Sequence, residues 1–117
     1  TPTIAFKNND LFFTTGSPGG AKIITAVLQS ILNIVEFEMN VAEANNAKRI
    51  HHQWQPDKIQ IEFDLTEDKK NWLLNAGYNI EIIEPATNLQ LIMKKNNTYY
   101  GYGDFRRPDS FALGVSK

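Results

Sequence analysis

The segment from Ala21 to Glu38 constrains the fold more than any other part of the chain. Its polar side chains form one narrow stripe at helical spacing, and almost every other position is apolar. The stripe consists of Lys22, Thr25, Gln29, Asn33 and Glu36. A helix that is apolar around most of its circumference has to be covered on more than one side. We therefore expect this helix to form a layer inside something larger than 117 residues.

The remaining segments predict a mixture of short strands and helices. A capping box at Asn40 and Glu43 starts a second, short helix that runs to about Ala47. A third helix over residues 66–76 ends at Gly77, and we expect Trp72, Leu73 and Leu74 to form its core side. Strands are expected at residues 3–6, 11–15, 58–63, 79–84, 89–94 and 98–102, followed by an irregular tail. The pattern predicts one compact α+β unit over residues 1–117.

Composition narrows the classes of function. Twelve Lys and Arg residues against thirteen Asp and Glu give a net charge of −1, and neither half of the chain is basic. We therefore expect no nucleic-acid partner, because wrapping a phosphate backbone requires a basic excess. The absence of cysteine excludes disulfides, thiolate metal sites and cysteine nucleophiles. The apolar stretch of the first predicted helix is too short, and is interrupted by too many polar residues, to span a membrane.

The run Gly16-Ser17-Pro18-Gly19-Gly20 lies between a predicted strand and the long helix. Two successive glycines allow a ligand to approach the backbone closely, and their N–H groups stand where a helix opens with unpaired donors. Such a pair suits a phosphate, a carboxylate or the oxyanion of acyl transfer. A plain turn that precedes a helix explains the same residues, and the residues alone favour it.

The other polar clusters point to structure rather than chemistry. Neighbouring His51 and His52 would point to opposite sides of an extended backbone, so they could not share one metal ion. Asp104 and Arg106 are expected to form an internal ion pair. The tyrosines near residue 100 are expected to pack on a strand. Neither a metal site nor a nucleophile with its base is visible.

Several motifs in one order resemble the small subunit of γ-glutamyltranspeptidase, in its C-terminal part. They are the glycine run, the helix Ala21–Met39, Asn40-Val41-Ala42-Glu43-Ala44, and His51-His52-Gln53-Trp54-Gln55-Pro56-Asp57. The resemblance implies a piece of the αββα sandwich of N-terminal-nucleophile hydrolases. A precursor of this family cleaves itself into a large and a small subunit. The freed N-terminal Thr then attacks a γ-glutamyl amide such as glutathione, with its own α-amine as base. The acyl-enzyme passes its γ-glutamyl group to water or to an amino acid or peptide. No metal or organic cofactor is implied.

By match to the family, the backbone N–H groups of Gly19 and Gly20 form the oxyanion hole, and Gly20 also lies beside the bound glutamyl group. The resemblance places Thr1 well downstream of the processing threonine, so Thr1 is expected to mark a fragment boundary rather than the nucleophile. The chain alone is then inactive. Its expected partners are the γ-glutamyl substrate, the rest of the small subunit and the large subunit. The resemblance alone implies a periplasmic or extracellular location.

Two other functions stay open from the sequence. One is a related N-terminal-nucleophile acylase, similar to cephalosporin acylase, that accepts a different side chain. The other is a non-catalytic binding or scaffolding module that keeps the fold.

Overall fold

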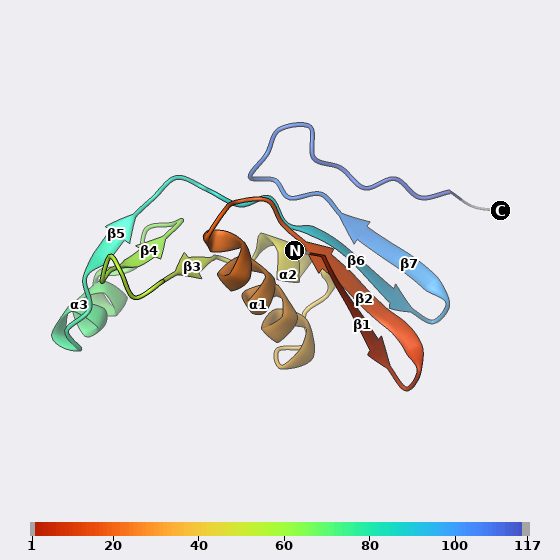
Figure 1. Ribbon diagram of the computed structural model, residues 1–117, viewed down its shortest axis with the longest axis horizontal. Helices are drawn as coiled ribbons and strands as arrows, with labels where there is room; N and C mark the ends of the chain where they lie inside the picture. The colour runs from red at the N-terminus through yellow and green to blue at the C-terminus, as the bar shows by residue number, and fades with distance from the viewer. Residues whose placement is uncertain (1, 116–117) are drawn as a thin grey trace. The chain divides into compact units, whose positions relative to one another are not determined.

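The computed structural model describes residues 2–115, which divide into two compact units. The first unit comprises residues 2–47 and 87–115, and the second comprises residues 48–86. Both units combine helices with strands, as Figure 1 shows. The expected α+β class is therefore confirmed. That residues 1–117 fold as a single unit stays a prediction.

The first unit is built on an antiparallel sheet with strand order β1-β2-β6-β7. The strands are β1 (Thr3–Lys7), β2 (Asp10–Gly16), β6 (Gln90–Lys95) and β7 (Thr98–Tyr102). Both hairpins turn through asparagine pairs, Asn8-Asn9 and Asn96-Asn97, whose φ angles lie between 50° and 64°. Asparagine tolerates positive φ better than most residues, and tight hairpin turns require it. The polar residues between the strand segments predict both turns.

Two helices pack on the sheet, α1 (Lys22–Val35) and α2 (Val41–Asn46). The buried core joins Phe13 and Leu91 of the sheet to Ile34 of α1 and Ala44 of α2. Helix α1 ends three residues before the predicted Glu38, because Glu38 has a φ of 51° and turns the chain toward the next cap. The capping box of α2 is confirmed: Asn40 accepts from the amides of Ala42 and Glu43, and Glu43 accepts from Asn40 N–H.

Helix α1 presents a second apolar side that the described residues do not cover. Ala26, Val27, Ser30 and Ile34 are buried, whereas Ile24 is 74% and Leu28 is 52% exposed. The sheet therefore covers one side of the helix. The cover that the sequence predicts for the other side would have to come from outside residues 2–115.

The second unit is a small three-stranded sheet with one helix. Its strands are β3 (Ile50–His51), β4 (Ile59–Ile61) and β5 (Ile80–Ile82). β3 and β4 are antiparallel, while β4 and β5 run parallel, with α3 (Glu67–Asn75) in the connection between them. Gly77 has a φ of 89°, so the predicted left-handed end of α3 is confirmed. The sequence did not predict β3, because two residues are too few to show alternation.

The expected core role of Trp72, Leu73 and Leu74 is wrong. Leu73 is half-buried, but Trp72 is 68% and Leu74 is 49% exposed. Successive residues of a helix point about 100° apart, so a single sheet can cover at most one of three in a row. An apolar run without helical spacing therefore did not define a buried face.

An ion pair joins β2 to β6 and has a defined dependence on pH. Lys94 Nζ lies 2.7 and 2.9 Å from the two carboxylate oxygens of Asp10. This hydrogen bond lowers the pKa of Asp10 below its ordinary 3.8 and raises the pKa of Lys94 above its ordinary 10.5. Because the Asp10 pKa is lowered by folding, its stabilising contribution is complete above 3.8 and is lost as the pH falls through the lowered value.

We predict that Asp10→Asn destabilises the full-length protein at neutral pH and that the difference from wild type shrinks in acid. Urea unfolding of both proteins at neutral pH and at a pH below the lowered Asp10 pKa measures it. Lys94→Met is the matched variant, because it removes the other partner of the ion pair. Its difference from wild type in the free energy of unfolding should also shrink in acid. A difference that stays constant across this range would contradict the assignment.

Candidate functional site

The glycine run forms the junction between β2 and α1. Gly16 is the last residue of β2 and pairs with Gln90 of β6, after which the chain leaves the sheet. Gly19 and Gly20 have φ angles of 137° and 60°, which residues with a Cβ adopt rarely. The conformation of the junction thus requires glycine at both positions. An added Cβ at Gly20 would meet nothing within 4 Å, so there it is the φ angle and not crowding within the chain that favours glycine.

The two glycines use their carbonyl oxygens but not their amides. The Gly19 oxygen accepts from Lys22 N–H at 3.3 Å and the Gly20 oxygen accepts from Ile23 N–H at 3.2 Å. Within residues 2–115, the N–H groups of Gly19 and Gly20 donate to no protein acceptor. They stand at the opening of α1, where the helix dipole is positive. Gly20 with φ of +60° followed by Ala21 with φ of −60° also has the alternating signs of an anion-binding nest.

Ser17 connects the junction to the segment that leads into β6. Its side chain is buried, with 8% of the residue exposed. Its hydroxyl donates to the Pro18 carbonyl at 2.6 Å and accepts from Asn88 N–H at 3.2 Å. Sequence reasoning missed Ser17 because a serine beside a proline in a loop is ordinary turn composition. The available signal was its place within the glycine run, between Gly16 and Pro18.

A cavity of about 710 Å³ lies beside the junction. Gly16, Ser17 and Pro18 line it together with parts of β6, β7 and the tail segment 111–114. Gly19 and Gly20 do not line this cavity.

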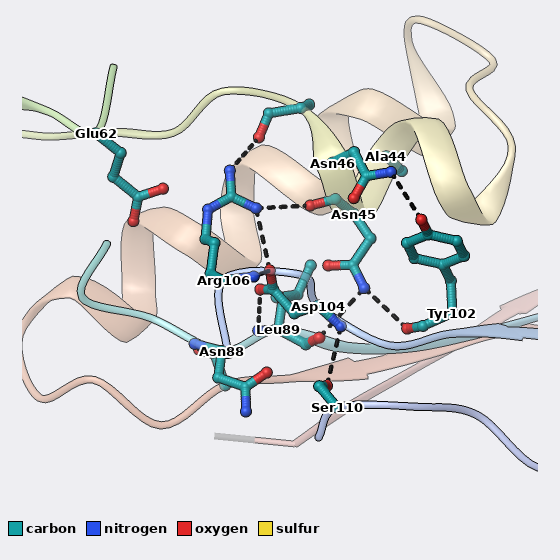
Figure 2. A network of polar contacts seen from close by, with 12 residues as sticks. Ala44, Asn45, Asn46, Glu62, Asn88, Leu89, Tyr102, Asp104, Arg106 and Ser110 are labelled. Carbon is teal, nitrogen blue, oxygen red and sulfur yellow. Dashed lines mark hydrogen bonds and ion pairs between the residues drawn. The ribbon is translucent and has the colours of Figure 1, made fainter. Parts of the chain in front are cut away.

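The segment before β6 is held by a buried ion pair, which Figure 2 shows. Asp104 is fully buried, and its Oδ2 accepts from Leu89 N–H at 2.7 Å. Its Oδ1 accepts from the Arg106 guanidinium at 3.2 Å, and both side chains have no exposed surface. The expected ion pair of Asp104 and Arg106 is therefore confirmed. It fixes the backbone of Leu89, the residue directly after Asn88.

Arg106 also closes the end of α2. Its Nη1 donates to the Asn45 carbonyl at 3.0 Å and its Nη2 donates to the Ala47 carbonyl at 2.8 Å. These carbonyls lie at the C-terminal end of the helix, where a cation is favourable. Asn45 of α2 makes a second connection, because its Nδ2 donates to the carbonyls of Leu89 and Tyr102 (Figure 2). The tail, α2 and the start of β6 are thus joined through one network.

The histidines do not form a site. His51 is buried and its Nε2 lies 2.9 Å from Gln53 Oε1, whereas His52 Nε2 lies 3.2 Å from Asp57 Oδ1. No group of three or more residues that could hold a metal ion is found within residues 2–115. That the two histidines do not share a metal ion stays a prediction. Thr1 lies outside the described residues.

None of the helices within residues 2–115 has the length and apolar character needed to cross a membrane.

Comparisons with known proteins identify the family of the chain. A family model described as Gamma-glutamyltranspeptidase matches residues 1–114. The chain belongs to the γ-glutamyltranspeptidase family. It is 39% identical over 115 residues to the glutathione hydrolase proenzyme of Escherichia coli, and the aligned residues make up 97% of this chain and 20% of that protein. The chain therefore spans about a fifth of the length of that relative.

Solved structures give the same family and a wider fold relationship. A mutant γ-glutamyltranspeptidase from Helicobacter pylori superposes with a TM-score of 0.86 at 40% identity, over 92% of this chain and 60% of that one. The expected place of the chain in an N-terminal-nucleophile hydrolase sandwich is thereby confirmed. Cephalosporin acylase from Bacillus halodurans superposes with a TM-score of 0.85 over 99% of this chain and 22% of that one, at 20% identity. At that identity the similarity concerns the fold alone.

We predict that Arg106→Ala in the full-length protein lowers the free energy of unfolding by about 3–5 kcal/mol, because it leaves the Asp104 carboxylate buried without its partner. Arg107→Ala is the matched control. Arg107 is exposed and its change should stay within about 0.5 kcal/mol. Chemical denaturation of both variants measures the difference. Equal stabilities of the two would show that the network in Figure 2 does not hold the tail.

Proposed function

We propose that this chain is the C-terminal part of the small subunit of a γ-glutamyltranspeptidase and that it supplies the oxyanion hole. The observation that carries the proposal is the pair of Gly19 and Gly20 amides, which have no acceptor within residues 2–115 and stand at the opening of α1. The family membership of the chain supports the same role. The whole protein cleaves γ-glutamyl amides such as glutathione.

In the proposed reaction, the hydroxyl oxygen of an N-terminal Thr outside this chain attacks the γ-carbonyl carbon of the substrate. The threonine's α-amine accepts the hydroxyl proton and later gives it to the leaving amine. As the new C–O bond forms, negative charge develops on the former carbonyl oxygen. The Gly19 and Gly20 amides donate hydrogen bonds to that oxygen, and Gly20 also lies beside the glutamyl group. Water or an amino acid or peptide then takes the γ-glutamyl group from the threonine.

The partners of this chain are then the rest of its small subunit and the large subunit cut from the same precursor. Two features leave room for them. One side of α1 is apolar and exposed, and the two glycines do not line the 710 Å³ cavity beside the junction. We propose that the missing subunit parts cover that side and complete the pocket, and that the protein acts in the periplasm or outside the cell. The chain alone is inactive, because the nucleophile lies elsewhere.

A related acylase would share the fold but differ in substrate. Sequence identity favours the γ-glutamyl reading, because the γ-glutamyltranspeptidase from H. pylori is 40% identical and the cephalosporin acylase only 20%. A panel of γ-glutamyl anilide, glutaryl and adipyl amides with the full-length enzyme separates the two. Faster turnover of the amides that lack the glutamyl α-amino group would overturn the γ-glutamyl assignment.

We predict that Gly20→Pro lowers kcat of the intact enzyme for a γ-glutamyl anilide about a hundredfold or more, because proline has no N–H to donate and its ring also excludes the φ of 60° that Gly20 adopts. Gly20→Ala is the matched variant, since it keeps the N–H. Its methyl group meets no atom of this chain. The alanine has to adopt a left-handed φ, which costs about 1–2 kcal/mol of stability. Because no donor is lost, we expect kcat to stay within about fivefold of wild type.

Steady-state kinetics on the processed enzyme gives both values, and thermal unfolding shows whether each variant remains folded. If a folded Gly20→Pro enzyme turns over the anilide at the wild-type rate, the Gly20 amide is not an oxyanion donor.

A further inference from the structure

We propose that Ser17 is a positioning residue that aims the Gly19 amide at the oxyanion. This inference rests on the proposed function of the glycine pair and adds a residue to it. Ser17 is buried, with 8% exposed, and both of its hydrogen bonds go to backbone groups of the junction and of the neighbouring segment.

The peptide unit between Pro18 and Gly19 carries the N–H group of the first proposed donor. A peptide unit is planar and trans, so the Pro18 carbonyl and the Gly19 N–H point in opposite directions within one rigid plane. The Ser17 hydroxyl donates to the Pro18 oxygen at 2.6 Å. Holding that oxygen on the Ser17 side therefore directs the Gly19 N–H to the other side of the plane. One side-chain hydrogen bond sets the direction of one proposed oxyanion donor.

Within residues 2–115, the Ser17 hydroxyl is the hydrogen-bond partner found for this peptide plane, through the Pro18 oxygen. The orientation of the plane depends on ψ of Pro18 and φ of Gly19, since the proline ring fixes only its own φ. Glycine accepts almost any φ, and Gly19 has a φ of 137°. The Gly19 N–H has no acceptor within residues 2–115 that would keep the plane in place. Without the hydroxyl, the peptide unit is free to rotate and the donor loses its aim.

Ser17 is itself fixed by the interior of the first unit. Its Oγ accepts from Asn88 N–H at 3.2 Å. The next residue, Leu89, is completely buried and its N–H is bound by the Asp104 carboxylate (Figure 2). The buried ion pair therefore places Asn88, Asn88 places the serine oxygen, and the serine proton places the peptide plane. A chain of contacts runs from the tail to the glycine pair.

The same contacts argue against Ser17 as a nucleophile. Its proton is already donated to a carbonyl oxygen, and its other hydrogen bond is to a backbone amide. Among residues 2–115, no histidine or carboxylate is bonded to its hydroxyl to act as a base.

The test compares Ser17→Ala, Ser17→Cys and Ser17→Thr in the full-length, processed enzyme. Loss of the hydroxyl in Ser17→Ala should lower kcat about tenfold to a hundredfold, while KM changes less than about threefold, because the donor acts only on the developing charge. Ser17→Cys fills a similar volume with a weaker donor and should give an intermediate kcat. Ser17→Thr keeps the hydroxyl and should recover most of the activity.

A second measurement separates positioning from general damage. The affinity for a γ-boronate analogue of glutamate, which becomes tetrahedral at the active-site threonine, should fall by the same factor as kcat/KM. The affinity for glutamate itself, which mimics the ground state, should remain unchanged. Ser30→Ala is the control, because it removes another buried hydroxyl of the same unit, one that bonds to Val27 and Thr15 and not to the junction. It should leave kcat at the wild-type value.

The outcomes distinguish this inference from the proposed function. If Gly20→Pro lowers kcat and the Ser17 variants do not, the oxyanion hole stands and Ser17 has no positioning role. If neither change lowers kcat, the glycine pair is not the oxyanion hole. Equal losses of boronate and glutamate affinity in Ser17→Ala would show a structural effect and would also overturn the inference.

Discussion

The structure depends on how the chain passes from β2 to α1 through two residues with positive φ. Gly19 and Gly20 can adopt these angles because they lack a Cβ, and their amides donate to no acceptor within residues 2–115. Unpaired backbone N–H groups are costly inside a protein unless a ligand or water satisfies them. A junction of this kind is stable at a surface, where water satisfies the N–H groups, or against a ligand.

The rest of the first unit serves to hold that junction. Asn88 reaches the junction through Ser17, and the Asp104–Arg106 pair fixes the segment behind Asn88. The two glycines thus lie between segments that side-chain hydrogen bonds and a buried ion pair hold in place.

Sequence reasoning predicted the parts of this arrangement that local chemistry determines. The Asn40 capping box, the asparagine turns, the end of α3 at Gly77 and the ion pair of Asp104 and Arg106 all depend on residues close together in the chain. The links through Ser17, Asn45 and Asn88 join residues 44 to 71 positions apart, so no spacing in the sequence announces them. The predicted core role of Trp72 was wrong because an apolar side chain does not show whether another element packs over it. The glycine pair itself could be read from the residues as a turn, and only the resemblance favoured an oxyanion hole.

A crystal structure of the processed, full-length enzyme with a γ-boronate analogue of glutamate bound to the nucleophilic threonine tests directly whether the two glycine amides form the oxyanion hole. We expect one boronate oxygen to lie about 2.7–3.1 Å from the amide nitrogens of both Gly19 and Gly20. A boronate oxygen bound by other donors, with both glycine amides turned toward protein acceptors or solvent, would contradict it.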